Sequence, residues 1–387
     1  MKTAVLVSCF DYYPNRLELI ESYLVENGYQ VTYITSNYDP VIRGEFVSSN
    51  PAAIQIPVIQ YKKSISIDRV RSHYGFAKGV YQNLLEIKPD LVVAMLPPNF
   101  VSYFVAKYKK KFPHTKLVLD IYDLWPQSFP SEKAKKVLAL PFYFWSLLRN
   151  SSLKNADLIL TECHYYQDML RDVLPKNVPI STFYLARKKS QEDKKSVLDK
   201  QEIRFCYLGS INNVIDIDGI VSLLDAVNHQ RPVKIEIIGG GQRTEEFMDK
   251  LKAHGIEIVF HGKIFDDAEK QEIFNRCHYG INMMKDTVAV GLTMKSLDYF
   301  NGNLPIVNTI KGDTKQLVED YQVGVNINLN DLNKSVKDVL EMADDHEPLM
   351  RSQVESVFNH YFSVDAVNQT VRKALEDSLI INRKLEI

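Results

Sequence analysis

The chain has 387 residues, of which 45% are hydrophobic and 25% charged, and its formal net charge is −1 at pH 7. This length is more than one hydrophobic core normally serves and predicts two domains, while the composition is that of a soluble globular protein. No apolar run reaches the roughly 18 residues that span a bilayer, and the absence of a strongly basic domain argues against nucleic-acid binding.

The N-terminal stretch MKTAVLVSCFDYYP carries one lysine and a short apolar run, without a small-residue cleavage site. We interpret it as a buried strand rather than a signal peptide. The four cysteines form no CxxC pair, which disfavours disulfides and a zinc site and fits a reducing cytoplasm. The nine histidines show no ligand spacing, so we expect neither a metal nor another cofactor.

Short apolar runs alternate with amphipathic helical patterns along the whole chain. The runs are TAVLVSCF, QVTYITS, DLVVAML, KLVLDIYD, DLILTEC and PISTFYL, then IRFCYLG, VKIEIIG, IEIVFHG, YGINMM, LPIVNT and GVNINL. Near-continuous apolar strands between helices predict parallel sheets covered on both faces. Two such series predict an α/β protein with two doubly wound, Rossmann-like domains facing across a cleft.

The charged run ARKKSQEDKKSVLDKQ is almost without apolar residues, which is typical of a solvated linker. We predict an N-terminal domain at residues 1–185, a linker at 186–202 and a second domain at 203–362. A final helix at 363–387 is expected to pack back on the first domain. Residues 1–185 hold 21 Lys and Arg against 16 Asp and Glu, and the rest of the chain 26 against 32, so the first half is moderately basic.

Ligands of open α/β sheets bind outside the carboxyl ends of the strands. Near one such end, LTMKSLDYFNGNLPIVNT places Lys295 close to the predicted start of a helix, where a cation costs about 0.3–1 kcal/mol. Lys295 and Asp298 either form a surface ion pair, worth about 0.2–0.5 kcal/mol, or hold a phosphate and a sugar hydroxyl. The pattern alone leaves both interpretations open.

Three other segments carry candidate groups. GGGQR, Gly239 to Arg243, suits close approach of a phosphate, although a tight strand–helix turn explains it equally well. In IYDLWPQS, Asp123 either caps the next segment, with Trp125 in the core, or orients an acceptor hydroxyl. Asp216-Ile217-Asp218 has the form of a DxD motif, but it precedes a helical pattern where acids act as caps, so we interpret it as structural.

Taken in order, these segments resemble the GT-B glycosyltransferases, especially the retaining family-four enzymes of surface-polysaccharide synthesis. The Lys295 helix resembles their donor-site helix, and LDIYDLWPQSF resembles their Asp-x-x-Asp-Leu-Trp-Pro segment. VLVSCFDYYP…ENGYQVTYITS and NADLILTECHYYQDML resemble the opening and closing elements of their first domain. YLGSINNVIDIDGIVSLLDAV, IEIIGGGQRTEEF and FHGKIF resemble the loops of their nucleotide-binding half. The resemblance covers nearly the whole chain and rests on order and spacing.

The resemblance implies an acceptor domain followed by a nucleotide-sugar-binding domain. Asp298 would hold the donor ribose, Lys295 with Arg243 or Lys285 would neutralise the diphosphate, and Asp123 would act on the acceptor side. The implied catalytic residues are Asp123 and Lys295; the implied donor-binding residues are Gly209, Ser210, Gly241, Arg243, Lys263, Phe265, Lys285 and Asp298; the implied acceptor-binding residues are Asp11, Tyr12 and Tyr13. Two departures stand out: Val290 replaces the family's usual acid, and GSINNVIDIDG lacks its usual basic pair.

The function implied is transfer of a hexose from a nucleotide diphosphate, with UDP favoured, to a saccharide acceptor, with retention of configuration. Such an enzyme would act in capsule or exopolysaccharide biosynthesis, with the nucleotide sugar as substrate rather than cofactor. Two alternatives stay open: a nucleotide-sugar epimerase of the same fold, and a non-catalytic GT-B partner of an active transferase. The two departures favour the second alternative.

KAKKVLALPFYFWSLLR, Lys133 to Arg149, is an aromatic apolar run bordered by basic residues, and KYKKKFPHTK lies upstream of it. A buried helix with a charged border would explain this pattern, as would a peripheral membrane surface. Because the family often uses lipid-linked acceptors, we favour contact with an anionic membrane and a lipid-linked saccharide acceptor. The protein would then lie in the cytoplasm at the inner face of the membrane.

Overall fold

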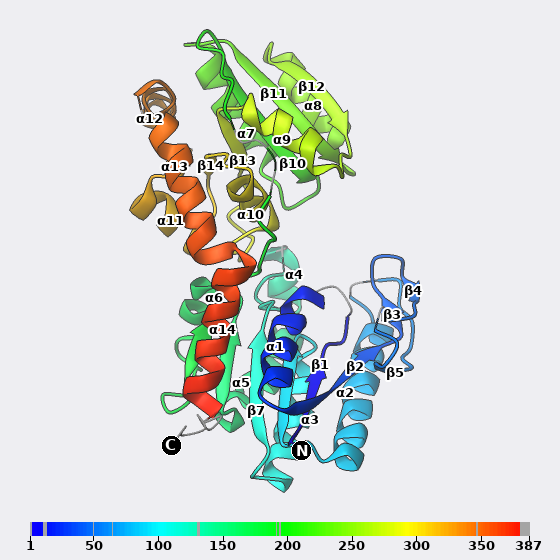
Figure 1. The fold of residues 1–387 in the computed structure, drawn as a ribbon. Helices are drawn as coiled ribbons and strands as arrows, with labels where there is room; N and C mark the ends of the chain where they lie inside the picture. The colour runs from blue at the N-terminus through cyan, green and yellow to red at the C-terminus, as the bar shows by residue number, and fades with distance from the viewer. Residues whose placement is uncertain are drawn as a thin grey trace, which may run out of the picture. The chain divides into compact units, whose positions relative to one another are not determined.

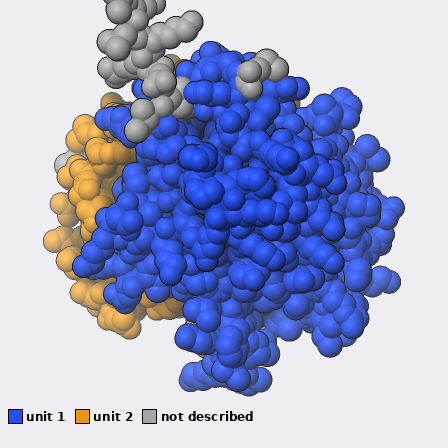
Figure 2. Space-filling view, turned by 90° about the horizontal axis from the view of Figure 1, so that it is seen from below, with its two compact units in different colours: residues 1–186, 367–387 blue, residues 187–366 orange. Residues whose placement is uncertain are grey.

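The computed structural model describes residues 2–10, 14–48, 50–63, 65–129, 132–190, 192, 195–345 and 347–379. The chain divides into two compact units, which Figures 1 and 2 show. Unit 1 comprises residues 1–186 and 367–387, and unit 2 comprises residues 187–366. Each unit contains one parallel sheet with helices, which confirms the predicted α/β class with two Rossmann-like domains.

Unit 1 is built around a seven-stranded parallel sheet with the order β5-β2-β1-β6-β7-β8-β9. Its strands are β1 (Lys2–Val7), β2 (Tyr29–Ser36), β5 (Ile54–Ile56), β6 (Leu91–Leu96), β7 (Lys116–Ile121), β8 (Leu158–Thr161) and β9 (Ile180–Thr182). Every residue of β6 is buried, because a central strand of a parallel sheet is covered on both faces. The short strands β3 (Tyr38–Asp39) and β4 (Gly44–Glu45) form a separate antiparallel pair.

The helices of unit 1 connect and cover these strands (Figure 1). They are α1 (Pro14–Glu26), α2 (Ile67–Ile87), α3 (Asn99–Lys111), α4 (Glu132–Val137), α5 (Ala139–Asn150), α6 (His164–Leu170) and most of α14 (Val364–Leu379), with a 3-10 turn at Leu153–Asn155. Helix α2 begins after Ser66, whose hydroxyl accepts a hydrogen bond of 3.2 Å from the backbone N–H of Arg69. This cap satisfies one of the free amides at the start of the helix.

Unit 2 is built around a six-stranded parallel sheet with the order β12-β11-β10-β13-β14-β15. Its strands are β10 (Ile203–Ser210), β11 (Val233–Gly240), β12 (Glu257–Gly262), β13 (Tyr279–Asn282), β14 (Ile306–Asn308) and β15 (Gly324–Asn326). Its helices are α7 (Ile217–Asn228), α8 (Thr244–Ala253), α9 (Asp267–Asn275), α10 (Met294–Asn301), α11 (Asp313–Tyr321), α12 (Leu332–Asp345) and α13 (Glu347–Val357), followed by a π-helical turn at Phe358–Phe362. All the apolar runs predicted as strands contain one.

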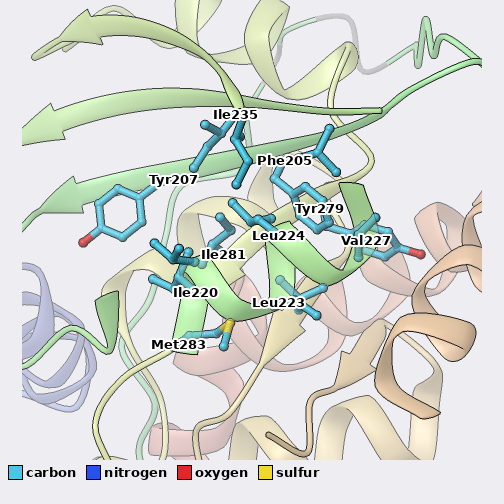
Figure 3. Close-up of a cluster of buried hydrophobic side chains, with 14 of the residues drawn as sticks. Phe205, Tyr207, Ile220, Leu223, Leu224, Val227, Ile235, Tyr279, Ile281 and Met283 are labelled. Carbon is cyan, nitrogen blue, oxygen red and sulfur yellow. The ribbon is translucent and has the colours of Figure 1, made fainter. Parts of the chain in front are cut away.

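The core of unit 2 lies where α7 packs on the middle strands of its sheet (Figure 3). Leu223 and Leu224 of α7 belong to the same buried cluster as Phe205 of β10 and Ile281 of β13. Tyr207 of β10 lies at one end of this cluster, and its hydroxyl points away from the aliphatic side chains (Figure 3). The cluster therefore fixes the strand end at which Tyr207 lies.

Helix α14 begins in unit 2 and continues into unit 1. Val367, Val371, Leu375 and Leu379 are buried in the core of unit 1, in one cluster with side chains of α1, β1, β6 and β8. Their spacing of four residues places them on one face of the helix. The core of unit 1 is thus completed by a segment far from the rest of it in sequence.

All four cysteines carry buried thiols, two in unit 1 (Cys9 and Cys163) and two in unit 2 (Cys206 and Cys277). This placement agrees with thiols that pack as small apolar groups. Within the described ranges, no helix is both long enough and apolar enough to cross a membrane.

Candidate functional site

Helix α10 is anchored at the carboxyl edge of the unit 2 sheet. Thr293 caps the helix by accepting a hydrogen bond from the backbone N–H of Ser296 at 3.1 Å. The Tyr299 hydroxyl accepts a hydrogen bond of 2.8 Å from the Leu208 N–H and donates one of 3.1 Å to the Cys206 carbonyl. These bonds tie α10 to β10, so the first turn of α10 has a fixed position beside the end of β10.

Lys295 lies in that first turn, and its side chain points toward β10. Its Nζ is 4.4 Å from the centroid of the Tyr207 ring and 3.4 Å from the Tyr207 hydroxyl. A Cβ at Gly209 would lie 3.8 Å from Cγ of Lys295, so the lysine stem passes close to the β10 backbone. Part of the side chain reaches solvent, and burial of the rest lowers the pKa of Lys295 to about 7.

The loops after β10 and β11 approach each other closely because glycines line them. A Cβ at Gly239 would lie 2.2 Å from the Gly209 carbonyl oxygen, and one at Gly241 would lie 2.4 Å from that of Ile211. The backbone N–H of Arg243 donates to the same Ile211 oxygen at 3.1 Å. The structure therefore places Gly209, Ser210, Gly241 and the Arg243 backbone together at this edge, with Lys295 against Gly209.

The Arg243 side chain is occupied within its own helix, because its Nε donates to Oε2 of Glu246 at 2.7 Å. Asp298 accepts a hydrogen bond of 3.1 Å from Nε of Arg187. The sequence suggested an ion pair between Asp298 and Lys295, three residues earlier. In the structure the Lys295 ammonium contacts Tyr207 instead. Sequence reasoning missed both Arg187 and Tyr207; the only signal for Arg187 was its position in a basic run at the domain boundary.

Lys263 and Phe265 lie on the loop after β12, and 85% of the Phe265 side chain is exposed. Lys285 lies elsewhere, at the wall of a cavity of about 610 Å³ at the carboxyl ends of β13, β14 and β15. Lys311 and Lys315 also line this cavity. Apart from Asp298, which pairs with Arg187, the predicted donor residues thus fall into an edge group around Lys295, an exposed loop after β12 and this cavity.

Three asparagines, two of them buried and the third half-buried, connect the last three strands beside this cavity. Nδ2 of Asn282 donates to Oδ1 of Asn308 at 3.0 Å, and Nδ2 of Asn308 donates to Oδ1 of Asn326 at 2.8 Å. The three residues are register partners in β13, β14 and β15. This ladder satisfies amide groups that would be costly to bury alone.

Both acids of the Asp216-Ile217-Asp218 segment lie at the start of a helix, as the sequence context predicted. Asp216 caps α7 by accepting a hydrogen bond of 3.1 Å from the Gly219 N–H. Asp218 lies in the first turn of α7 and pairs with Lys250 at 2.5 Å. Among the described residues, no group of three or more His, Cys, Asp or Glu side chains is placed to hold a metal ion.

In unit 1, Asp123 follows the carboxyl end of β7. Its Oδ1 accepts a hydrogen bond of 2.7 Å from the Ser128 hydroxyl. Burial raises the pKa of Asp123, while Ser128, the backbone and the charges of Arg69 and Arg149 act in the opposite direction. The predicted acceptor residues Asp11, Tyr12 and Tyr13 lie outside the described residues.

Glu162 is a second carboxyl group at the same sheet edge, and sequence reasoning missed it. It follows β8, and its backbone N–H donates to the Ile121 carbonyl of β7 at 3.0 Å. Burial raises the pKa of Glu162 to about 8, although the charge of Arg16 acts against this shift. An acid inside the apolar run LILTEC was the sequence signal that could have identified it.

Residues 17–184 match the family model described as Glycosyltransferase Family 4, and residues 202–345 match the one described as Glycosyl transferases group 1. Among solved structures, sucrose-phosphate synthase from Thermosynechococcus elongatus is 12% identical with a TM-score of 0.69, over 99% of this chain and 100% of that one. The lipopolysaccharide outer core galactosyltransferase WaaB is 14% identical with a TM-score of 0.65, over 97% and 99%. Anabaena HepE, solved with UDP and glucose, is 12% identical with a TM-score of 0.63, over 97% and 100%.

A comparison with curated protein sequences gives no match. At these low identities the solved structures show the fold alone. The two family models, by contrast, are both glycosyltransferase models, and each matches one of the two parallel-sheet units. The chain therefore belongs to the glycosyltransferases of GT-B fold.

Proposed function

We propose that this glycosyltransferase moves a hexose from a nucleotide diphosphate, with UDP favoured, to a saccharide acceptor in surface-polysaccharide biosynthesis. Unit 2 binds the donor through the edge group around Lys295, and unit 1 binds the acceptor near Asp123. The observation that carries the proposal is the position of the Lys295 ammonium, at the first turn of α10 and against the Gly209 backbone. A diphosphate there would meet a cation, free helix amides and a glycine-lined backbone together.

This arrangement supports a defined chemical role for Lys295. Negative charge grows on the leaving diphosphate as the sugar–phosphate bond breaks, and a fixed cation next to that oxygen lowers the barrier. With retention of configuration, the leaving phosphate accepts the proton of the incoming hydroxyl. Asp123 then orients that hydroxyl rather than acting as the base.

Similar proteins support the proposed substrates. HepE was solved with UDP and glucose, which favours UDP as the nucleotide here. WaaB is a lipopolysaccharide galactosyltransferase, which favours a lipid-linked saccharide as the acceptor class. With such an acceptor, we propose that the protein acts in the cytoplasm, at the inner face of the membrane that carries the acceptor.

The test is calorimetric titration with UDP, GDP and ADP. Lys295→Ala is expected to weaken UDP binding by about 10- to 100-fold, because a hydrogen bond to a charged group contributes about 1.5–3 kcal/mol. Asp298→Ala is expected to weaken it as well, if its carboxylate leaves Arg187 for the ribose. Lys252→Ala, an exposed lysine in the last turn of α8, is the matched control and should bind as the wild type does.

The non-catalytic partner is the second candidate, favoured by Val290 in place of an acid and by the engagement of Arg243 with Glu246. It predicts a folded protein that binds none of the three nucleotides. That result would remove the donor-site assignment.

A further inference from the structure

An apolar cavity of about 270 Å³ lies in unit 1 between the start of α2 and helix α5. Trp125, Phe142 and Trp145 form its aromatic wall, and Val70 and Leu138 line it too. The rings are packed together, with centroids 5.3 Å apart for Trp125 and Phe142 and 5.2 Å apart for the two tryptophans. Ser66 and Arg69 are its polar lining residues, so the cavity suits a hydrocarbon group.

The surface around this cavity exposes an apolar stripe. Leu140, Tyr143, Phe144 and Leu147 of α5 lie at i, i+3, i+4 and i+7, and their outward faces are exposed, with 66% for Leu140 and 61% for Tyr143. Ile67, Val70 and Tyr74 form a similar exposed stripe on the first half of α2. An apolar area of this kind marks an interaction site.

Basic residues border the apolar area. Lys62 and Lys63 precede α2, and Lys135 and Lys136 lie in the last turn of α4. Arg71, in the second turn of α2, pairs with Asp68 at 3.8 Å. This charge complements anionic lipid head groups or phosphates, while the stripes of α2 and α5 complement the acyl region beneath them. Charge and apolarity together favour a lipid over a soluble apolar ligand.

Arg69 lines the cavity and also acts on Asp123. Its guanidinium carbon lies 5.1 Å from the Trp125 ring centroid, and its charge acts on the Asp123 carboxyl. An apolar cavity, a cation on its wall and a carboxyl group under the influence of that cation thus occur together in unit 1. A lipid-linked saccharide has the same order: a hydrocarbon chain, a phosphate and a sugar hydroxyl.

We propose that this cavity binds the hydrocarbon chain of the lipid-linked acceptor, with its phosphate at Arg69 and its accepting hydroxyl at Asp123. The inference rests on the proposed function, since it assigns the acceptor of that reaction. Asp123 and Trp125 are two residues apart, so their Cα atoms are separated by about 7 Å at most. A reaction that attaches a first sugar phosphate to a lipid carrier would supply an acceptor with this sequence of groups.

The two tryptophans that line the cavity are the only ones in the chain, so intrinsic fluorescence reports on this place directly. The probe is farnesyl phosphate, with inorganic phosphate as the chain-free control. Farnesyl phosphate is expected to shift tryptophan emission saturably, and phosphate is expected to leave it unchanged. Binding without a change in emission would overturn the proposal.

Variants locate the bound chain and phosphate. Leu138→Gln, in the cavity wall, and Arg69→Gln are each expected to weaken farnesyl phosphate binding by about fivefold or more. Val137→Gln is the matched control, because Val137 precedes Leu138, is 81% exposed and does not line the cavity. Equal losses in Val137→Gln and Leu138→Gln would overturn the proposal. Circular dichroism and a cooperative unfolding transition followed by tryptophan fluorescence verify that unit 1 of each variant is folded.

A second experiment distinguishes binding of the acceptor's hydrocarbon chain from binding of a phospholipid acyl chain. Vesicles of phosphatidylglycerol and brominated phosphatidylcholine, without prenyl phosphate, are expected to quench the tryptophans less than brominated prenyl phosphate does. Equal quenching that is insensitive to Arg69→Gln would assign the cavity to phospholipid and overturn the proposal. Lys295→Ala should leave farnesyl phosphate binding unchanged, so a failed donor site and a failed acceptor cavity give different results.

Discussion

At the scale of single residues, Lys295 places an ammonium group where burial disfavours its charged form. Burial lowers its pKa to about 7, so the ammonium loses its proton as pH rises through neutrality. A bound diphosphate favours the charged form and raises this pKa again. We therefore expect affinity for UDP-glucose to fall from pH 6 to pH 8.5, and binding near pH 8 to take up a proton.

Calorimetry in buffers of different ionisation enthalpy measures that proton uptake directly. Lys295→Arg is the control, because a guanidinium stays charged over this whole range. Its binding should lack the proton uptake. Unchanged uptake in Lys295→Arg would mean that another group titrates.

The buried carboxyl group of Glu162 should make the stability of the protein depend on pH. Its pKa is raised from 4.5 to about 8 in the folded protein, so the folded state keeps a proton that the unfolded state releases. Stability from this group is present below pH 4.5 and is lost as pH rises toward 8, by at most about 1.4 kcal/mol per pH unit. Glu162→Gln should remove this loss. The free energy of unfolding of the variant, measured in urea and compared with that of the wild type, should therefore increase from pH 5 to pH 8. Glu86→Gln, at an exposed position, should show no such trend.

At the scale of elements, one buried ion pair joins α1 to β7. Arg16 binds Asp120 through two hydrogen bonds of 2.7 Å, and both side chains are almost fully buried. Removing one partner leaves the other charge buried and uncompensated. We expect Asp120→Asn to lower the free energy of unfolding by about 3–5 kcal/mol in urea titrations. Asp168→Asn breaks the exposed pair with Arg171 and should cost about 1 kcal/mol or less.

At the scale of the whole molecule, helix α14 determines which unit depends on the C-terminus. A chain ended after Ala366 keeps all of unit 2 but loses the apolar face of α14 from the core of unit 1. We expect it to bind UDP with near wild-type affinity while unit 1 loses its cooperative unfolding. Calorimetry measures the first property and tryptophan fluorescence the second, since both tryptophans lie in unit 1. Loss of UDP binding in this variant would show that unit 2 depends on unit 1.

The strands of both sheets could be predicted from the sequence, because strands buried on both faces must be apolar along their length. The helical start at Lys295 and the cap at Asp216 could be predicted because their signals are local. The partner of Asp298 could not, since Arg187 is 111 residues away in sequence. The contact between Lys295 and the Tyr207 ring could not be predicted either, because nothing in the sequence distinguishes Tyr207 from the other aromatic residues in strands.

The placement of the cysteines has a consequence for chemical labelling. Each unit holds two buried thiols, and burial raises the pKa of Cys9 well above its usual value. An alkylating reagent reacts with the thiolate, so it modifies these residues only when the surrounding structure opens. Mass spectrometry of peptides containing Cys9 or Cys163, against those containing Cys206 or Cys277, would therefore time the opening of each unit separately in one intact, unmutated chain.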